Sequence, residues 1–179
     1  YWDGEVPFET VNVMKLGEAS VRAMALQDGS ADIGINIAAS DRAVLEAAGT
    51  YQLDVTGGNR VCNWFINFDG VLGNDALRKA VAMAIDGQTV CDISTGGSYT
   101  YTNNVPVPGY DLENPYGYDQ EAAVAMLDEA GIVDSDGDGY RELDGKNIDI
   151  NIVATTSRQQ DVIAQAYGVQ LEEIGIKST

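Results

Sequence analysis

Three aspartates in a short glycine-rich segment have the spacing of a calcium-binding loop. Asp134, Asp136 and Asp138 occupy the first, third and fifth positions of an EF-hand pattern. Gly139 follows at the sixth position, where the loop turns sharply, but Gly145 stands at the twelfth, which needs a bidentate glutamate. The alternative is a turn in which the aspartates hydrogen-bond their own backbone. We expect no resident metal or cofactor, and calcium at these aspartates stays an open alternative.

The amino-acid composition limits which catalytic and metal-binding sites this chain can form. The 179 residues contain no histidine, which excludes serine–histidine and cysteine–histidine nucleophile systems and imidazole metal sites within the chain. Ten basic and 28 acidic residues give a formal net charge of −18, so nucleic acid is a poor partner. No two carboxylates have a spacing that predicts a paired acid and base. We therefore expect a protein that is not an enzyme, with a carboxylate-based hydrolase as the less favoured alternative.

The two cysteines, Cys62 and Cys91, match no zinc-binding spacing. They could form a disulfide or remain two buried thiols, and we expect Cys62 to be a small buried hydrophobic residue. No stretch reaches the roughly 18 consecutive apolar residues of a membrane-spanning helix. The chain starts at Tyr1 without a methionine, so we expect a segment of a longer protein with any export signal or lipid anchor upstream.

Hydrophobic periodicity predicts helices that alternate with strands. The predicted helices span 19–29, 41–49, 74–86, 87–94, 119–131 and 158–173, and the predicted strands span 9–16, 31–37, 60–68 and 146–155, with another starting at Ile176. Ser40 and Asn74 are expected to cap the helices that follow them, and Gly131 is expected to end the helix before it. Tyr167 falls on the apolar face of the last helix. The order indicates an α/β fold with two strand–helix–strand units.

Three further features concern the organisation of the chain. The predicted strand 60–68 (RVCNWFINF) is almost continuously apolar, which is typical of a strand covered on both faces. The segment 95–118 is rich in Gly, Pro, Tyr and Asn and indicates a long ordered loop. A composition change near 69–73 suggests a boundary between residues 1–70 and residues 71–179.

Four segments, in this order, resemble family 5 of the extracellular solute-binding proteins, which includes oligopeptide-, dipeptide- and nickel-binding receptors of ABC importers. They are YWDG (1–4), LQDGSADIG (26–34), FIN (65–67) paired with NDALRKAVAMAIDGQTV (74–90), and MLDEAGIVDSDGDGYRELDG (126–145). The second segment lacks the glutamate that is usual in the family near the strand start. In the family, the fourth segment connects a helix to a strand, so the resemblance favours a turn at the aspartates.

The resemblance implies a fragment of a two-lobed fold of the type II periplasmic-binding-protein kind. Residues 1–70 would belong to lobe I and would include the crossover strand, and residues 71–179 would begin the second main lobe. It also implies the substrate-binding component of a bacterial ABC importer, located outside the cytoplasm in the periplasm or as a cell-surface lipoprotein. Its expected partners are a peptide or similar small solute and the membrane subunits of the permease. A calcium-stabilised cell-surface module is the alternative function.

Candidate ligand-binding residues follow from where the resemblance places the cleft. The strand resembling RVCNWFINF runs to the crossover between lobes, which selects Asn63 and Trp64: an indole can stack on a solute, and an amide can donate and accept hydrogen bonds. Tyr99 and Tyr101 alternate with small residues in the loop 95–104 and could line the same cleft. Trp64 could equally belong to the core, and the two tyrosines could serve ordinary loop packing. Asn67 is expected to fix the crossover turn.

Overall fold

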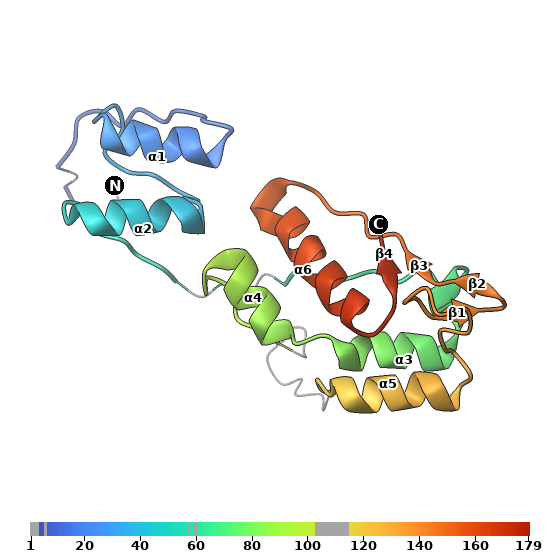
Figure 1. Cartoon of the computed structure of the whole chain (residues 1–179). Coiled ribbons are helices and arrows are strands. Elements are labelled where there is room, and N and C mark those ends of the chain that lie inside the picture. Colours follow the sequence, from blue (N-terminus) through green and yellow to red (C-terminus); the bar gives the residue numbers. More distant parts are fainter. Residues whose placement is uncertain (1–3, 6, 57, 59–60, 103–114) are drawn as a thin grey trace. The chain divides into compact units, whose positions relative to one another are not determined.

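The computed structural model describes residues 4–5, 7–56, 58, 61–102 and 115–179 (Figure 1). The chain divides into two compact units, Tyr1–Asp54 and Val55–Thr179. The assignment of residues 1–70 and 71–179 to two lobes stays a prediction. Among the described residues, no helix is both long enough and apolar enough to cross a membrane.

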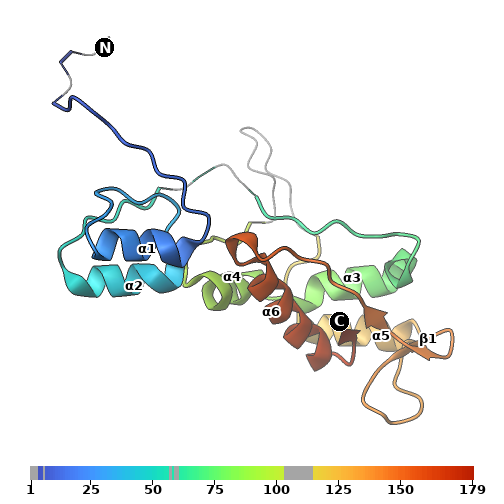
Figure 2. The same cartoon turned by 90° about the horizontal axis from the view of Figure 1, so that it is seen from above.

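The described part of the first unit contains two helices, α1 (Ala19–Gln27) and α2 (Ala39–Ala48), which lie side by side in Figures 1 and 2. Leu45 is completely buried between them, together with small residues of α1. The prediction that Ser40 caps α2 is wrong. Ala38, in extended conformation, holds the N-cap position without a side-chain hydrogen bond, and Ser40 is already helical.

The strands predicted at 9–16 and 31–37 are wrong, because both segments are irregular in the structure. Their apolar residues face outward: Val13 is 91% exposed and Ile33 is 83% exposed. A strand requires a neighbour that accepts and donates its backbone hydrogen bonds. No described segment pairs with either one as a strand. Only the helix of the first predicted strand–helix–strand unit is therefore present.

The second unit contains four helices in its described part: α3 (Asp75–Ala84), α4 (Gly87–Thr95), α5 (Gln120–Glu129) and α6 (Gln160–Glu173). Two short 3₁₀ turns, η1 (Val71–Gly73) and η2 (Ser157–Gln159), precede α3 and α6. Helix α3 packs against α5, and α6 packs against α4 (Figure 1). Their shared core includes Leu77, Ala80, Leu127, Ile148, Leu171 and Ile176.

The starts of α3, α4 and α5 agree with the sequence, whereas α6 begins at Gln160, after Arg158 and Gln159 in left-handed conformation. Asn74 caps α3, because its side-chain oxygen accepts a hydrogen bond of 3.0 Å from the amide of Leu77. Asp86 and Asp119 cap α4 and α5 in the same manner. Gly131, with φ of +72°, follows α5 in the left-handed conformation that lets a helix end.

Four short strands complete the described part of the second unit. Strands β1 (Glu142–Leu143) and β2 (Lys146–Asn147) form an antiparallel pair, and β3 (Asp149–Ile150) pairs in parallel with β4 (Lys177–Ser178). Helix α6 connects β3 to β4, so the second predicted strand–helix–strand unit is confirmed. The predicted strand 146–155 is correct only over its first half. The residues after Ile150 are irregular.

The segment 61–68, predicted as a strand covered on both faces, is irregular. Phe65 is 94% exposed and Cys62 is also exposed, whereas Trp64 packs against the core. The apolar character of this segment therefore does not correspond to burial on both sides. As at 9–16, no described strand pairs with it.

Candidate functional site

Trp64 marks the place where the segment 61–68 meets α6. Its ring lies against Tyr167 with the two ring centroids 5.0 Å apart and the planes tilted by 51°. Tilted pairs at this distance are favoured by the charge distribution of aromatic rings. Both residues pack against the core of the second unit and are only partly buried. Trp64 is thus neither a deep core residue nor a free surface residue.

Tyr167 is the aromatic residue that the sequence pattern places on the apolar face of the last helix. Burial raises the pKa of its phenol to about 12, and Tyr101 also raises it, while a hydrogen bond with Trp64 acts in the opposite direction. The Tyr167 hydroxyl is therefore neutral at physiological pH. Its proximity to Trp64 could have been anticipated only from the pairing of α6 with the segment 61–68, which no local pattern encodes.

Tyr101 follows α4 in sequence, and its ring packs against the first turn of this helix. A Cβ atom built on Gly87 would lie 2.2 Å from Cδ2 and Cε2 of the Tyr101 ring, so the ring rests directly on the glycine backbone. The backbone amide of Tyr101 donates a 3.4 Å hydrogen bond to the side-chain oxygen of Gln88. The side of the ring away from α4 stays accessible, since Tyr101 is 42% exposed. The structure thus packs Trp64 against Tyr167 and Tyr101 against Gly87.

Tyr99, the other predicted tyrosine, is partly buried against the core. Its amide donates to the hydroxyl of the buried Thr95 at 3.0 Å, and its own hydroxyl donates to the carbonyl oxygen of Arg158 at 3.4 Å. These contacts tie the loop after α4 to the start of α6. Residues 103–104, at the end of the predicted loop 95–104, lie outside the described residues.

The two asparagines differ in their roles. Asn63 is exposed next to Trp64. Asn67 forms the expected turn: its side-chain oxygen accepts from the amide of Asp69 at 3.0 Å, and its carbonyl oxygen accepts from the amide of Gly70 at 3.4 Å. Asn67 therefore holds the turn before η1, and the place of this turn at a crossover between lobes stays a prediction.

Both cysteines are free thiols. The expectation that Cys62 is buried is wrong: it is exposed, and its sulfur accepts a 3.6 Å hydrogen bond from the side-chain amide of Gln160 at the start of α6. The irregular segment 61–68 leaves this side chain uncovered. Burial raises the pKa of the Cys91 thiol, with smaller contributions from Asp92 and Cys62.

The aspartates of the segment 134–140 hydrogen-bond their own backbone. The two carboxylate oxygens of Asp134 accept from the amides of Gly137 at 2.7 Å and Gly139 at 2.9 Å. Asp136 and Asp138 each accept from the amide two residues further on, at 3.1 and 2.9 Å. One carboxylate oxygen from each aspartate lies within 4.8 Å of the other two, and all three residues are exposed. The hairpin β1–β2 follows instead of the second helix of an EF-hand, so the geometry is that of a self-bonded turn.

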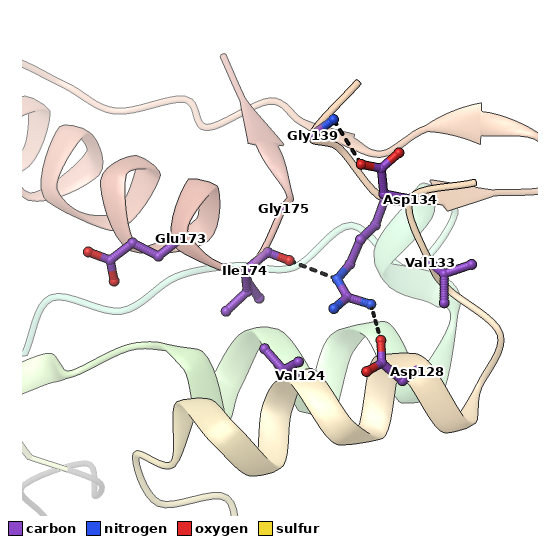
Figure 3. Close-up of a pocket in the computed structure, with 9 residues that line it drawn as sticks. Val124, Asp128, Val133, Asp134, Gly139, Glu173, Ile174 and Gly175 are labelled. Carbon is purple, nitrogen blue, oxygen red and sulfur yellow. Dashed lines mark hydrogen bonds and ion pairs between the residues drawn. The ribbon is translucent and has the colours of Figure 1, made fainter. Parts of the chain in front are cut away.

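A pocket beside this turn is organised by Arg141. It is lined by residues of α5, of the aspartate turn and of the connection from α6 to β4, most of them labelled in Figure 3. The guanidinium donates to the carbonyl oxygens of Ile174 (2.9 Å) and Ile132 (2.6 Å) and forms a 2.6 Å ion pair with Asp128. These contacts join three segments of the backbone, so Arg141 has a structural role.

Residues 1–179 match the sequence profile described as bacterial extracellular solute-binding proteins, family 5 Middle. The chain belongs to family 5 of the bacterial extracellular solute-binding proteins. This match covers every segment described above, including 1–3, which lie outside the described residues.

Individual relatives of this family-5 chain agree with the assignment. The oligopeptide-binding protein AppA of Bacillus subtilis (strain 168) is 24% identical over 193 residues, which cover 99% of this chain and 34% of AppA. The crystal structure of NikA from Brucella suis in complex with Fe(III)-EDTA superposes with a TM-score of 0.76 at 23% identity, over 100% of this chain and 38% of NikA. The structure of B. subtilis AppA in complex with a nonapeptide gives a TM-score of 0.64 at 22% identity, over 92% of this chain and 34% of AppA.

These similarities confirm the predicted fold class. The family-5 chain is a mixed α/β fragment of the type II periplasmic-binding-protein fold. It spans only about a third of the length of these relatives. Activity, solute and partners of the whole protein are therefore proposals.

Proposed function

We propose that this chain is part of the substrate-binding component of an ABC importer, which binds a peptide or similar small solute between two lobes and delivers it to the permease. The observation that carries the proposal is the family-5 match over residues 1–179. Such a receptor works outside the cytoplasm. Closure of two lobes on a solute shifts a conformational equilibrium and needs no covalent chemistry.

The set of three aromatic residues Trp64, Tyr101 and Tyr167 supports a solute-contacting role for this part of the chain. Two of its rings are packed against each other, and the third is held on α4 with one side accessible. Partly exposed aromatic rings supply a large contact area and lose little side-chain entropy on binding. We assign ligand contact to Trp64 and Tyr101. Asn63 adds an exposed amide next to Trp64, and Tyr99 packs against the core and supports the loop that carries Tyr101.

The identity of the solute is tested on the whole receptor that contains this chain. The receptor is purified without added ligand, and intact-mass spectrometry under non-denaturing conditions is compared with the mass after denaturation. We expect a peptide or other small molecule to be released on denaturation and to rebind unchanged in isothermal titration calorimetry. A molecule that is returned chemically altered would instead show an enzyme, and a receptor that never binds any released molecule would contradict the proposal.

The residue assignment is tested in the same receptor with a matched pair of substitutions. Tyr101→Ala removes a ring that is proposed to contact the solute, and Tyr140→Ala removes a partly buried ring in the aspartate turn. We expect Tyr101→Ala to weaken binding of the released solute about tenfold or more, as truncation of a central aromatic contact typically does. Tyr140→Ala should leave the dissociation constant unchanged. Equal effects of both substitutions would remove the assignment while leaving the receptor function intact.

A further inference from the structure

Gly87 occupies a position at which the backbone itself does not require glycine. It is the first residue of α4, and its φ is not among the positive values of the chain. Other glycines, such as Gly96 at the end of the same helix with φ of +57°, do adopt the left-handed conformation that penalises side chains. The missing side chain of Gly87 must therefore be explained by what lies against it.

The Tyr101 ring fills the space that a side chain at Gly87 would take. A Cβ atom there would approach Cδ2 and Cε2 to 2.2 Å and Cγ to 2.8 Å, well inside contact distance. Gly87 is buried, and the ring that covers it is 42% exposed and follows α4 on a loop. A methyl group at position 87 therefore requires the Tyr101 ring to move.

Tyr101 belongs to the same compact unit as the ring pair of Trp64 and Tyr167. The three side chains come from the loop after α4, from α6 and from the segment 61–68. The contact with Gly87 fixes the position of the Tyr101 ring on α4.

We propose that Gly87 is a positioning residue for solute recognition: it seats Tyr101 on α4, so that the partly exposed Tyr101 ring is held in place for contact with the solute. This inference rests on the proposed receptor function and adds to it a residue that does not itself touch the solute. It also makes the identity of residue 87 a determinant of affinity, since any side chain there displaces the ring.

The first test uses Gly87→Ala in the whole receptor and does not depend on a solute. Tyrosines are labelled with 3-fluorotyrosine, and the ¹⁹F resonance of Tyr101 is assigned by its loss in Tyr101→Phe. We expect Gly87→Ala to shift this resonance while the melting temperature stays within about 2 °C of wild type, because alanine suits the helical backbone. The control is Gly117→Ala, at which a Cβ meets nothing within 4 Å. An unshifted Tyr101 resonance in Gly87→Ala would overturn the proposal.

The second test measures affinity for the small molecules extracted from denatured wild-type receptor. We expect Gly87→Ala to weaken their binding roughly tenfold, Gly117→Ala to leave it unchanged, and Gly87→Ala combined with Tyr101→Ala to bind no more weakly than Tyr101→Ala alone, as for two changes acting through one contact. A displaced ring with unchanged affinity, or additive effects in the double variant, would overturn the positioning role. Failure of the wild-type receptor to bind the extract would instead contradict the receptor function.

Discussion

Two segments with the same strand–helix–strand pattern have different structures in this chain. Residues 146–179 form β3, α6 and β4, whereas residues 9–37 form α1 flanked by irregular segments. The amides of Lys177 and Thr179 donate to the carbonyl oxygens of Ile148 and Ile150 at 3.2 and 3.1 Å, and the amide of Ile152 donates to that of Thr179 at 2.7 Å. Alternation of apolar residues therefore shows which segments can become strands, and an available neighbour decides which of them do.

The largest expected difference between the two segments is in backbone hydrogen exchange. We expect the amides of Ile152, Lys177 and Thr179 to exchange at least about a hundredfold more slowly than those of Val11, Val13 and Ile33, because paired amides exchange only when the structure opens. Exchange of the isolated 179-residue chain, followed by mass spectrometry after proteolysis, measures both sets in one sample. Equal protection of 9–16 and 177–179 would show that the first segment is also paired, and the contrast would be lost.

The next effect is on stability. Ile148→Ala removes a side chain that is completely buried beside β3, so we expect a loss of about 2–5 kcal/mol in the free energy of unfolding of the second unit. Val153→Ala, further along the same predicted strand, removes a side chain that is 87% exposed and should change this free energy by less than about 0.5 kcal/mol. Urea unfolding followed by circular dichroism measures both. Similar costs at the two positions would mean that the predicted strand is formed along its whole length.

The helices were predictable because their signals are local. Asn74 and its bond to Leu77, the turn at Asn67 and the left-handed Gly131 involve residues within a few positions of one another. The outcome at 9–16 and 31–37 was not predictable, since strand pairing depends on residues distant in sequence. Local patterns also could not reveal that Ala38, rather than Ser40, precedes α2.

The candidate site shows the same division between local and distant information. Trp64 and Tyr101 could be selected from residue type and from the family resemblance. The contact of Trp64 with Tyr167 and that of Tyr101 with Gly87 join positions 103 and 14 residues apart, respectively, so no periodicity predicts them. Tyr167 was placed on the core face of its helix, which is correct for the helix but does not show that its ring also meets Trp64.

A third prediction compares the two cysteines. Cys62 lies in the irregular segment 61–68, and Cys91 lies in the packed helix α4. Cys62 is exposed, whereas Cys91 is partly buried and its pKa is raised chiefly by burial. Since the thiolate is the nucleophile, we expect iodoacetamide at pH 8 to modify Cys62 at least about threefold faster than Cys91. Peptide mass spectrometry on a time course gives the two rates, and the difference should vanish in urea. Faster modification of Cys91 would show that the segment 61–68 is covered and α4 is not.

The smallest expected effect concerns the aspartate turn 134–140, in which the aspartates accept hydrogen bonds from the backbone amides of the turn itself. Asp134 accepts two backbone amides that close the turn, whereas Asp136 accepts one. We therefore expect Asp134→Asn to lower the melting temperature at pH 7 by a few degrees, and by more than Asp136→Asn does, because a neutral amide with one acceptor oxygen cannot replace both bonds. Scanning calorimetry on the three proteins measures the difference.

The pH dependence of this effect follows from the sign of the Asp134 pKa shift. The backbone amide of Gly139 is the largest cause that lowers this pKa below its ordinary value of 3.8, so the folded chain favours the carboxylate. The stabilisation is complete well above pH 3.8 and is lost as the pH falls through the lower folded-state pKa, where Asp134 becomes protonated. The difference between wild type and Asp134→Asn should therefore shrink under acid conditions. If calcium raised the melting temperature of wild type but not of Asp134→Asn, the carboxylates would serve a cation, and the turn would not be held by its backbone bonds alone.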